Sequence, residues 1–172
     1  MDEDNCMVDI ARFFLDFTVD ESCGKCTPCR VGTKRLLELL DKIISGNGEL
    51  EDLDKMEELA TYIKSASLCG LGQTAPNHVL STLKHFRDEY VAHIVDKKCP
   101  AHVCKNLMEY RIEQDKCFGC GVCAKACPTN AFIKTDYIAP GKRVPAYTID
   151  QSKCVKCGMC IASCKFKAIV KK

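Results

Sequence analysis

Hydrophobic residues at helical spacing run through the N-terminal part of the chain. Four segments show the period of an amphipathic helix, namely residues 6–18, 27–45, 50–65 and 76–96. The last segment carries one apolar stripe, formed by Val79, Leu83, Phe86, Tyr90 and Ile94. Because amphipathic helices of this length are not stable alone, we expect them to pack together as a four-helix bundle.

The helical period weakens after residue 106, and short extended segments replace it. Two of them, AFIKTDYIA and RVPAYTID, flank Pro140 and Gly141, which predicts an antiparallel hairpin. The sequence therefore predicts an α+β chain with three parts. These are a helical domain at residues 1–96, a linker at residues 97–106 and a second domain at residues 107–172.

The distribution of charge supports a boundary near Asn106. Residues 1–106 carry 13 Lys and Arg against 18 Asp and Glu, whereas residues 107–172 carry 12 against 5. The net charge thus changes from −5 to +7 along the chain. Aromatic residues are only 7% and do not alternate with the basic ones, so we expect no nucleic-acid partner. No apolar run reaches the ~18 residues of a membrane span.

Fifteen cysteines in 172 residues are the most unusual feature of the composition. A secreted disulfide scaffold is one explanation for such a content. The odd number of cysteines, the acidic N-terminus without a basic signal region and the repeated CxxC spacing oppose it. Such thiolates are favoured ligands of soft metals, which predicts metal ligation in a reducing cytoplasm.

The strongest motif is CxxCxxCxxxC, which occurs twice, 37 residues apart. Three closely spaced thiolates fit three corners of a 4Fe–4S cube, and in the two-cluster pattern the fourth cysteine ligates the other cube. Cluster A is therefore assigned Cys117, Cys120, Cys123 and Cys164, and cluster B Cys154, Cys157, Cys160 and Cys127. Two zinc sites are the alternative, but zinc usually takes CxxC pairs separated by a longer loop.

This segment resembles a bacterial 2×4Fe–4S ferredoxin over about 55 residues. Pro128 follows Cys127 as in the ferredoxin motif, whereas Lys165 replaces the proline in the second copy. The 26 residues between Cys127 and Cys154 are more than the smallest ferredoxins have, and they contain the predicted hairpin. The hairpin is a candidate docking element for a neighbouring subunit.

A third CxxCxxC, formed by Cys23, Cys26 and Cys29, has no local fourth cysteine, because position 33 is Thr. A hairpin of the second and third helices would return the chain to the same end, where Cys69 lies in a Gly-rich turn. These four cysteines are predicted to hold another 4Fe–4S cluster, with zinc as the alternative.

Three cysteines remain, Cys6, Cys99 and Cys104. With His93 at the end of the fourth helix they form a candidate Cys3His zinc site, for which His102 is a substitute ligand. The alternative is that these cysteines are free thiols and that Cys6 is a small buried apolar residue.

The stretches ESCGKCTPCRVGTKR and SLCGLGQTAPN resemble the C-terminal bundle of the 51-kDa NADH-binding flavoprotein subunit of respiratory complex I, over residues 6–96. The resemblance implies one 4Fe–4S cluster on Cys23, Cys26, Cys29 and Cys69. The added ferredoxin-like part is similar to the beta subunit of multimeric, NAD(P)-linked, electron-bifurcating [FeFe] hydrogenases. Such subunits hold FMN and NAD(P) in a larger N-terminal domain, which implies that these 172 residues are the C-terminal portion of a longer subunit.

The predicted function is relay of single electrons between a flavin site outside these residues, a ferredoxin or sister subunit, and a hydrogenase. No catalytic residue is expected. The alternatives are a subunit of an NAD-dependent formate dehydrogenase or a complex I relative, and a free-standing ferredoxin-like carrier. An acidic partner such as ferredoxin is expected to dock near Lys125, Lys153, Lys156, Lys165 and Lys167, unless these lysines are only a solvated surface.

Overall fold

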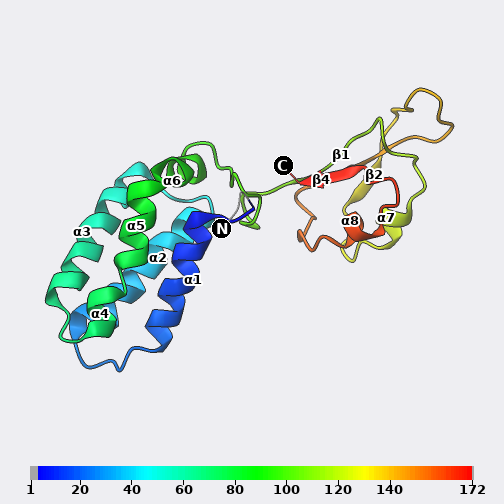
Figure 1. Cartoon of the computed structure of the whole chain (residues 1–172). Coiled ribbons are helices and arrows are strands. Elements are labelled where there is room, and N and C mark those ends of the chain that lie inside the picture. Colours follow the sequence, from blue (N-terminus) through cyan, green and yellow to red (C-terminus); the bar gives the residue numbers. More distant parts are fainter. Residues whose placement is uncertain (1–3, 172) are drawn as a thin grey trace. The chain divides into compact units, whose positions relative to one another are not determined.

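A computed structural model of the chain describes residues 4–171. It divides into two compact units, one ending at Leu107 and the other beginning at Met108. The first unit is helical and the second combines short strands with two short helices (Figure 1). The chain is therefore helix-rich and of the α+β class.

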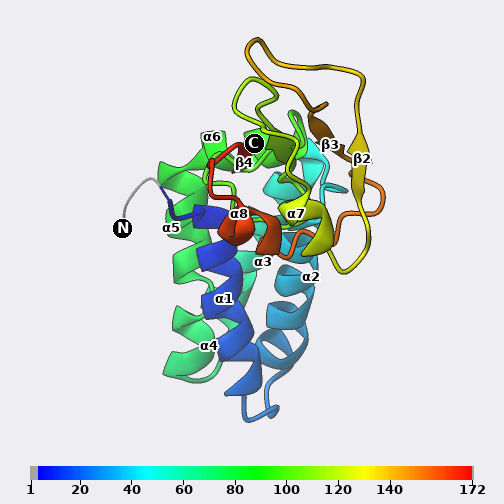
Figure 2. The same ribbon diagram turned by 90° about the vertical axis from the view of Figure 1, so that its right-hand side faces the viewer.

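The first unit contains six α-helices and a π-helical turn within the described residues. In chain order they are α1 (Met7–Asp20), η1 (Pro28–Gly32), α2 (Thr33–Ile44), α3 (Leu50–Ala66), α4 (Gly70–Thr74), α5 (Asn77–His85) and α6 (Arg87–Ile94). Helix α1 contacts α2 and α5, and α3 contacts the same two helices. These helices lie side by side in both views of the chain (Figures 1 and 2).

The core of this unit is formed by the apolar faces predicted from the helical period. Leu15, Leu36, Leu40 and Ile63 are fully buried, and Met56 lies among them. Full burial of each such side chain contributes about 2 kcal/mol to folding. Cys99, Cys104 and Leu107 belong to the same core, so residues 97–107 pack against the helices.

The prediction of one continuous helix over residues 76–96 was wrong. Phe86, with φ −131° and ψ 34°, separates α5 from α6. It was expected on the apolar stripe but is 42% exposed. The break turns Phe86 outward while Tyr90 and His93, on α6, reach complete burial. A hydrogen bond of 2.8 Å between the hydroxyls of Thr82 and Tyr90 bridges the break.

The helix predicted for residues 27–45 begins with the π-helical turn η1 before it becomes α-helical. Thr33 is bound here twice to the carbonyl of Cys29, through its backbone N–H and through a 2.6 Å bond from its hydroxyl. Gly32 lies against α3, and a Cβ at this position would fall 2.7 Å from Ile63 Cγ1. Such turns are frequent at functional sites, and the apolar period does not signal their extra residue per turn.

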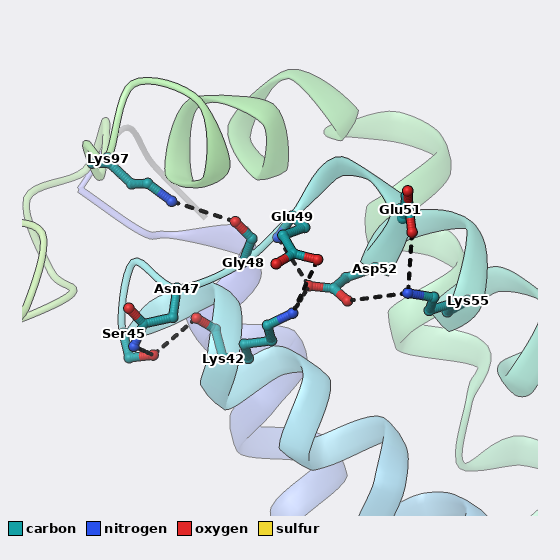
Figure 3. Close-up of polar contacts among 9 residues, drawn as sticks. All are labelled: Lys42, Ser45, Asn47, Gly48, Glu49, Glu51, Asp52, Lys55 and Lys97. Carbon is teal, nitrogen blue, oxygen red and sulfur yellow. Dashed lines mark hydrogen bonds and ion pairs between the residues drawn. The ribbon is translucent and has the colours of Figure 1, made fainter.

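The turn between α2 and α3 is held by a buried carboxylate (Figure 3). Asp52 accepts a 2.9 Å hydrogen bond from the backbone N–H of Glu49 and forms a 2.8 Å ion pair with Lys42. Burial alone would raise the pKa of Asp52, but the hydrogen bonds from Lys42 and Glu49 lower it below its usual value. Lys97 donates to the carbonyl of Gly48 at 3.3 Å, which ties the segment after α6 to this turn.

The second unit contains two antiparallel strand pairs. Its elements are β1 (Tyr110–Ile112), α7 (Val122–Lys125), β2 (Phe132–Lys134), β3 (Tyr147–Ile149), α8 (Met159–Ser163) and β4 (Ile169–Lys171). Strands β2 and β3 pair with Phe132 opposite Ile149, which confirms the predicted hairpin. Strands β1 and β4 join the two ends of the unit, with Tyr110 opposite Lys171.

The sequence repeat is visible in the two short helices of this unit. Gly121 precedes α7 with φ 72° and Gly158 precedes α8 with φ 78°, 37 residues later. Positive φ at these positions favours glycine, which carries no Cβ. Each tight turn lies between the second and third cysteines of its run. Each turn therefore bends its own run so that the three cysteines can face one centre.

Candidate metal centres

Two cavities of the second unit are each lined by four cysteines. The first is lined by Cys117, Cys120 and Cys123 from the segment leading into α7, and by Cys164 at the end of α8. The second combines three cysteines of the later run with the fourth cysteine of the earlier run. Cys154, Cys157 and Cys160 come from the segment at α8, and Cys127 follows α7. Contact between α7 and α8 carries the fourth cysteine of each run to the opposite cavity.

The thiols of these cavities occupy two kinds of environment. Burial raises the pKa of Cys123 to about 11 and also raises the pKa of Cys160. At Cys127 burial opposes ionisation, but hydrogen bonds from the Ala131 N–H, at 3.4 Å, and from Thr129 lower the pKa overall. Buried thiols of the first kind need a bound cation to be held as thiolates, and an iron–sulfur cluster supplies it.

A tyrosine covers the glycine turn of each cavity. A Cβ at Gly121 would fall 3.2 Å from the Tyr147 hydroxyl, and one at Gly158 would fall 3.3 Å from the Tyr110 hydroxyl. Burial, together with repulsion from the cysteines of the second cavity, raises the pKa of Tyr110. The two cavities thus have matching walls, and their four-thiol donor sets fit 4Fe–4S clusters.

The segments that carry the N-terminal cysteines lie at one end of the helical unit (Figure 1). Cys23 and Cys26 lie between α1 and η1, Cys29 lies within η1, and Cys69 directly precedes α4. The backbone N–H of Leu68, beside Cys69, hydrogen-bonds Cys26 and lowers its pKa. A Cβ at Gly72, in α4, would fall 3.1 Å from the Cβ of Cys29. The α1–η1 loop and the start of α4 are therefore in contact, as the predicted ligand set requires.

Two serines line this end of the helices and were not foreseen from the cysteine spacing. The Ser22 hydroxyl lies 3.4 Å from Cys29 Sγ, within hydrogen-bond distance. Ser67 is 4% exposed, and its Oγ has no hydrogen-bond partner among the described residues. That hydroxyl lies beside Gly72, the residue that approaches Cys29. An unpaired buried donor at this position fits a sulfur-rich group held by these cysteines.

Cys6, His93, Cys99 and Cys104 form a tight buried group at the other end of the helical unit. Their four ligand atoms all lie within 4.8 Å of one another, and no residue of the group is more than 3% exposed. His93 Nε2 lies 3.3 Å from Cys6 Sγ and 3.4 Å from Cys104 Sγ. His102, the other histidine considered, is not part of this group.

The ring of His93 is oriented by its second nitrogen. Nδ1 lies 2.7 Å from the carbonyl of Glu89 and donates to it, which leaves Nε2 directed at the thiols. The carboxylate of Glu89 in turn accepts from the backbone N–H of Met7, at 2.9 Å, next to Cys6. One residue of α6 therefore fixes both the imidazole and the start of α1.

The thiols of this group compete for protons. Hydrogen bonds from Cys104 and Cys6 lower the pKa of Cys99. The pKa of Cys104 is raised instead, because Cys104 contacts Cys6 and Cys99. Burial opposes protonation of His93, but hydrogen bonds to Cys6 and Cys99 raise its pKa to about 10. Three thiolates packed this closely repel one another unless a cation lies between them, so the donor set fits a tetrahedral zinc ion.

The lysines expected to form a docking surface differ in their surroundings. Lys125, Lys165 and Lys167 are exposed, and Lys153 is exposed with a 3.6 Å ion pair to Asp150. Lys156 is half-buried and lines the second cavity. Among the described helices, none has the length and hydropathy of a membrane span.

Known proteins resemble the chain in both units. Residues 9–93 match the family described as NADH-ubiquinone oxidoreductase-F iron–sulfur binding region, and residues 116–168 match the 4Fe–4S dicluster domain. The HndC subunit of the NADP-reducing hydrogenase of Solidesulfovibrio fructosivorans is 58% identical over 135 residues, which are 78% of this chain and 28% of HndC. The F subunit of the NADH-quinone oxidoreductase of Streptomyces coelicolor is 46% identical over 99 residues, which are 58% of this chain and 22% of that protein.

A solved structure is also similar. The NAD+-reducing [NiFe]-hydrogenase in its H2-reduced state matches with a TM-score of 0.53 and 36% identity, covering 55% of this chain and 16% of that chain. The chain spans about a quarter of the length of the two curated relatives. Taken together, these matches show that the chain joins an NADH-ubiquinone oxidoreductase-F iron–sulfur binding region to a 4Fe–4S dicluster domain, and that it is similar to part of the F-type subunits of NADH-quinone oxidoreductases and of the NADP-reducing hydrogenase subunit HndC.

Proposed function

We propose that the chain is an electron relay that binds three 4Fe–4S clusters. The main support is the pair of four-cysteine cavities in the second unit, each completed by a cysteine from the opposite run. The third cluster is assigned to Cys23, Cys26, Cys29 and Cys69, whose loops are in contact. Clusters bound at these sites carry one electron at a time, and the chain tunes them through hydrogen bonds, burial and charge.

The helices of the first unit have a scaffolding role in this proposal. Helices α1, α2 and α3, with α5 and α6 as the interrupted fourth member, act as a four-helix bundle with a metal centre at each end. Zinc bound by Cys6, His93, Cys99 and Cys104 cross-links the start of α1, helix α6 and the segment after it. Zinc has no redox chemistry, so this end is structural and the other end transfers electrons.

The partners are proposed from the names of the relatives. HndC belongs to an NADP-reducing hydrogenase, and the similar solved structure is an NAD+-reducing hydrogenase. We infer that this chain serves a multisubunit NAD(P)-linked hydrogenase in the cytoplasm, where hydride chemistry takes place on a flavin outside these residues. A formate dehydrogenase, a complex I relative and a free-standing carrier remain the alternatives. A hydrogenase protein that copurifies with the native chain would favour the hydrogenase assignment over these three.

A soluble acidic ferredoxin is the proposed external partner of the second unit. Residues 107–172 carry a net charge of +7. Two oxidised clusters of about −2 each would leave this part at about +3, which still attracts an acidic protein. The exposed lysines named above supply the contact surface.

The test is anaerobic reconstitution of the 172-residue chain with iron and sulfide, followed by metal analysis and electron paramagnetic resonance (EPR). We expect about twelve irons per chain, reducible paramagnetic centres and about one zinc. Cys117→Ala and Cys154→Ala chains should each lose about four irons, and Cys23→Ala should lose a different four. A colourless chain that contains only zinc would show instead that the cysteines serve a purely structural module.

A further inference from the structure

The loop between β2 and β3 lies directly on the cysteine segment of cavity A, the cavity lined by Cys117, Cys120, Cys123 and Cys164. A Cβ at Gly119 would fall 2.5 Å from the carbonyl oxygen of Pro145 and 2.8 Å from Val144 Cγ1. The Tyr137 hydroxyl donates to the carboxylate of Asp115 at 2.7 Å. The loop is therefore attached at two points to the residues that precede and separate the first cysteines.

Lys142 is a loop residue whose side chain contacts the backbone of a predicted ligand. Its ammonium donates to the carbonyl of Cys117 at 2.9 Å and also to the carbonyl of Asp115. It lies 4.6 Å from the centre of the Phe118 ring, which stacks on Phe166 at 4.2 Å. Both aromatic rings line the cavity, and the lysine is half-buried above them.

The positive charge of Lys142 is not neutralised by a direct ion pair. Within residues 4–171 no carboxylate approaches its ammonium to within 4.0 Å, although Lys116 and Lys153 each pair with a nearby acid. Asp115 contacts Lys142 through its backbone carbonyl, whereas its carboxylate accepts a hydrogen bond from the Tyr137 hydroxyl. A half-buried charge of this kind acts over several ångströms with little screening.

We propose that Lys142 sets the reduction potential of cluster A. Reduction adds one negative charge to the cluster, and a fixed ammonium beside Cys117 favours the reduced form. Lys142 is a positioning residue as well, because its two carbonyl contacts hold the segment that carries Cys117. The proposal rests on the proposed function, since it requires a cluster in that cavity.

The experiment is a redox titration of the reconstituted 172-residue chain with dithionite as electron donor, followed by EPR. A Cys120→Ala chain identifies the wave of cluster A, and cluster B serves as an internal reference. Lys142→Met keeps the apolar stem over Phe118 but removes the charge. We expect the one-electron reduction equilibrium of cluster A to fall about tenfold, which is about 59 mV, with cluster B unchanged.

Three further variants make the outcome decisive. Arg143→Met removes the same charge from the exposed neighbouring position, and we expect it to leave both potentials unchanged. Lys142→Arg should keep the potential of cluster A, and Lys142→Gln, which can still donate to the carbonyls, should lower it as Lys142→Met does. Equal potentials in Lys142→Met and the unmodified chain would overturn the proposal. So would loss of cluster A iron in both neutral variants, which would assign Lys142 a purely structural role.

Failure of this proposal is distinguishable from failure of the proposed function. If the unmodified chain takes up no iron at Cys117, Cys120, Cys123 and Cys164, the cluster assignment itself is wrong. If it takes up iron normally but the potential of cluster A is the same in Lys142→Met, the proposed electron relay stands and the proposed role of Lys142 is wrong.

Discussion

At the scale of single residues, the hydroxyl of Ser22 is placed where it would tune the proposed N-terminal cluster. It lies 3.4 Å from Cys29 Sγ, and with a thiolate as acceptor the hydroxyl must be the donor. Hydrogen bonds to cluster sulfurs favour the reduced form. We expect Ser22→Ala to make reduction of this cluster less favourable by about 1 kcal/mol, measured by EPR redox titration.

Ser45→Ala is the matched control for this prediction. The Ser45 hydroxyl donates to the carbonyl of Lys42, in the turn between α2 and α3, and touches no cysteine. Its replacement should leave all three potentials where they were. Equal potentials in the Ser22→Ala and Ser45→Ala chains would contradict the proposed bond to the cluster.

The two histidines near the linker give a second prediction at this scale. His93 belongs to the buried four-residue group and His102 does not. We expect His93→Gln to lose the zinc, because a neutral amide is a poor zinc ligand, and His102→Gln to keep it. Elemental analysis of the two purified chains measures this directly. Zinc retained in His93→Gln and lost in His102→Gln would reverse the assignment.

At the scale of elements, the turn between α2 and α3 depends on one buried carboxylate. The side chain of Asp52 is only 3% exposed and bonds both the backbone of Glu49 and the ammonium of Lys42 (Figure 3). We expect Asp52→Ala to lower the free energy of unfolding by about 2 kcal/mol. Asp54→Ala removes a carboxylate that is 79% exposed and should cost less than about 0.5 kcal/mol. Denaturant titration followed by circular dichroism compares the two.

The contribution of Asp52 should also depend on pH in a defined direction. Its pKa is lowered in the folded chain, so the unfolded chain binds more protons as the pH falls through the usual Asp value of about 3.9. The difference between the unmodified chain and Asp52→Ala should stay constant from about pH 8 to pH 5 and shrink below about pH 4. A difference that grows on acidification would contradict this linkage.

The helical period of the apolar residues located the helices of the first unit but not the breaks within them. Residues 50–65 were predicted as a helix, and α3 is observed at Leu50–Ala66. The break at Phe86 was missed because residues on either side of it keep the same apolar spacing. The π-helical turn η1 was missed because it precedes Leu36, where the apolar period of this helix begins.

At the scale of the whole molecule, the asymmetry of charge predicts how the chain would meet an acidic partner. The lysines on the second unit should steer an acidic ferredoxin, so the rate constant for electron transfer should fall as ionic strength rises. A Lys165→Gln, Lys167→Gln chain should be slower at low salt and less sensitive to salt. Lys64→Gln, on α3, is the control. Stopped-flow rates independent of ionic strength would indicate that these lysines are only a solvated surface.

The sequence by itself determined that the chain offers 4Fe–4S sites, because the spacing of cysteines along a tight backbone decides which thiolates can share a cube. It also determined the helical core, since apolar residues at a fixed period have only one face to bury. The group of Cys6, His93, Cys99 and Cys104 was named from composition and position, and the tertiary structure brought its atoms within reach.

Only the tertiary structure decided which polar groups surround those cysteines. Ser22, Ser67 and Lys142 carry no spacing signal, and they matter because the packing of loops sets them beside Cys29 or Cys117. The physical reason is the range of the forces involved. Ligand spacing is local along the backbone, whereas a hydrogen bond or a charge acts through space on whatever the fold brings near it.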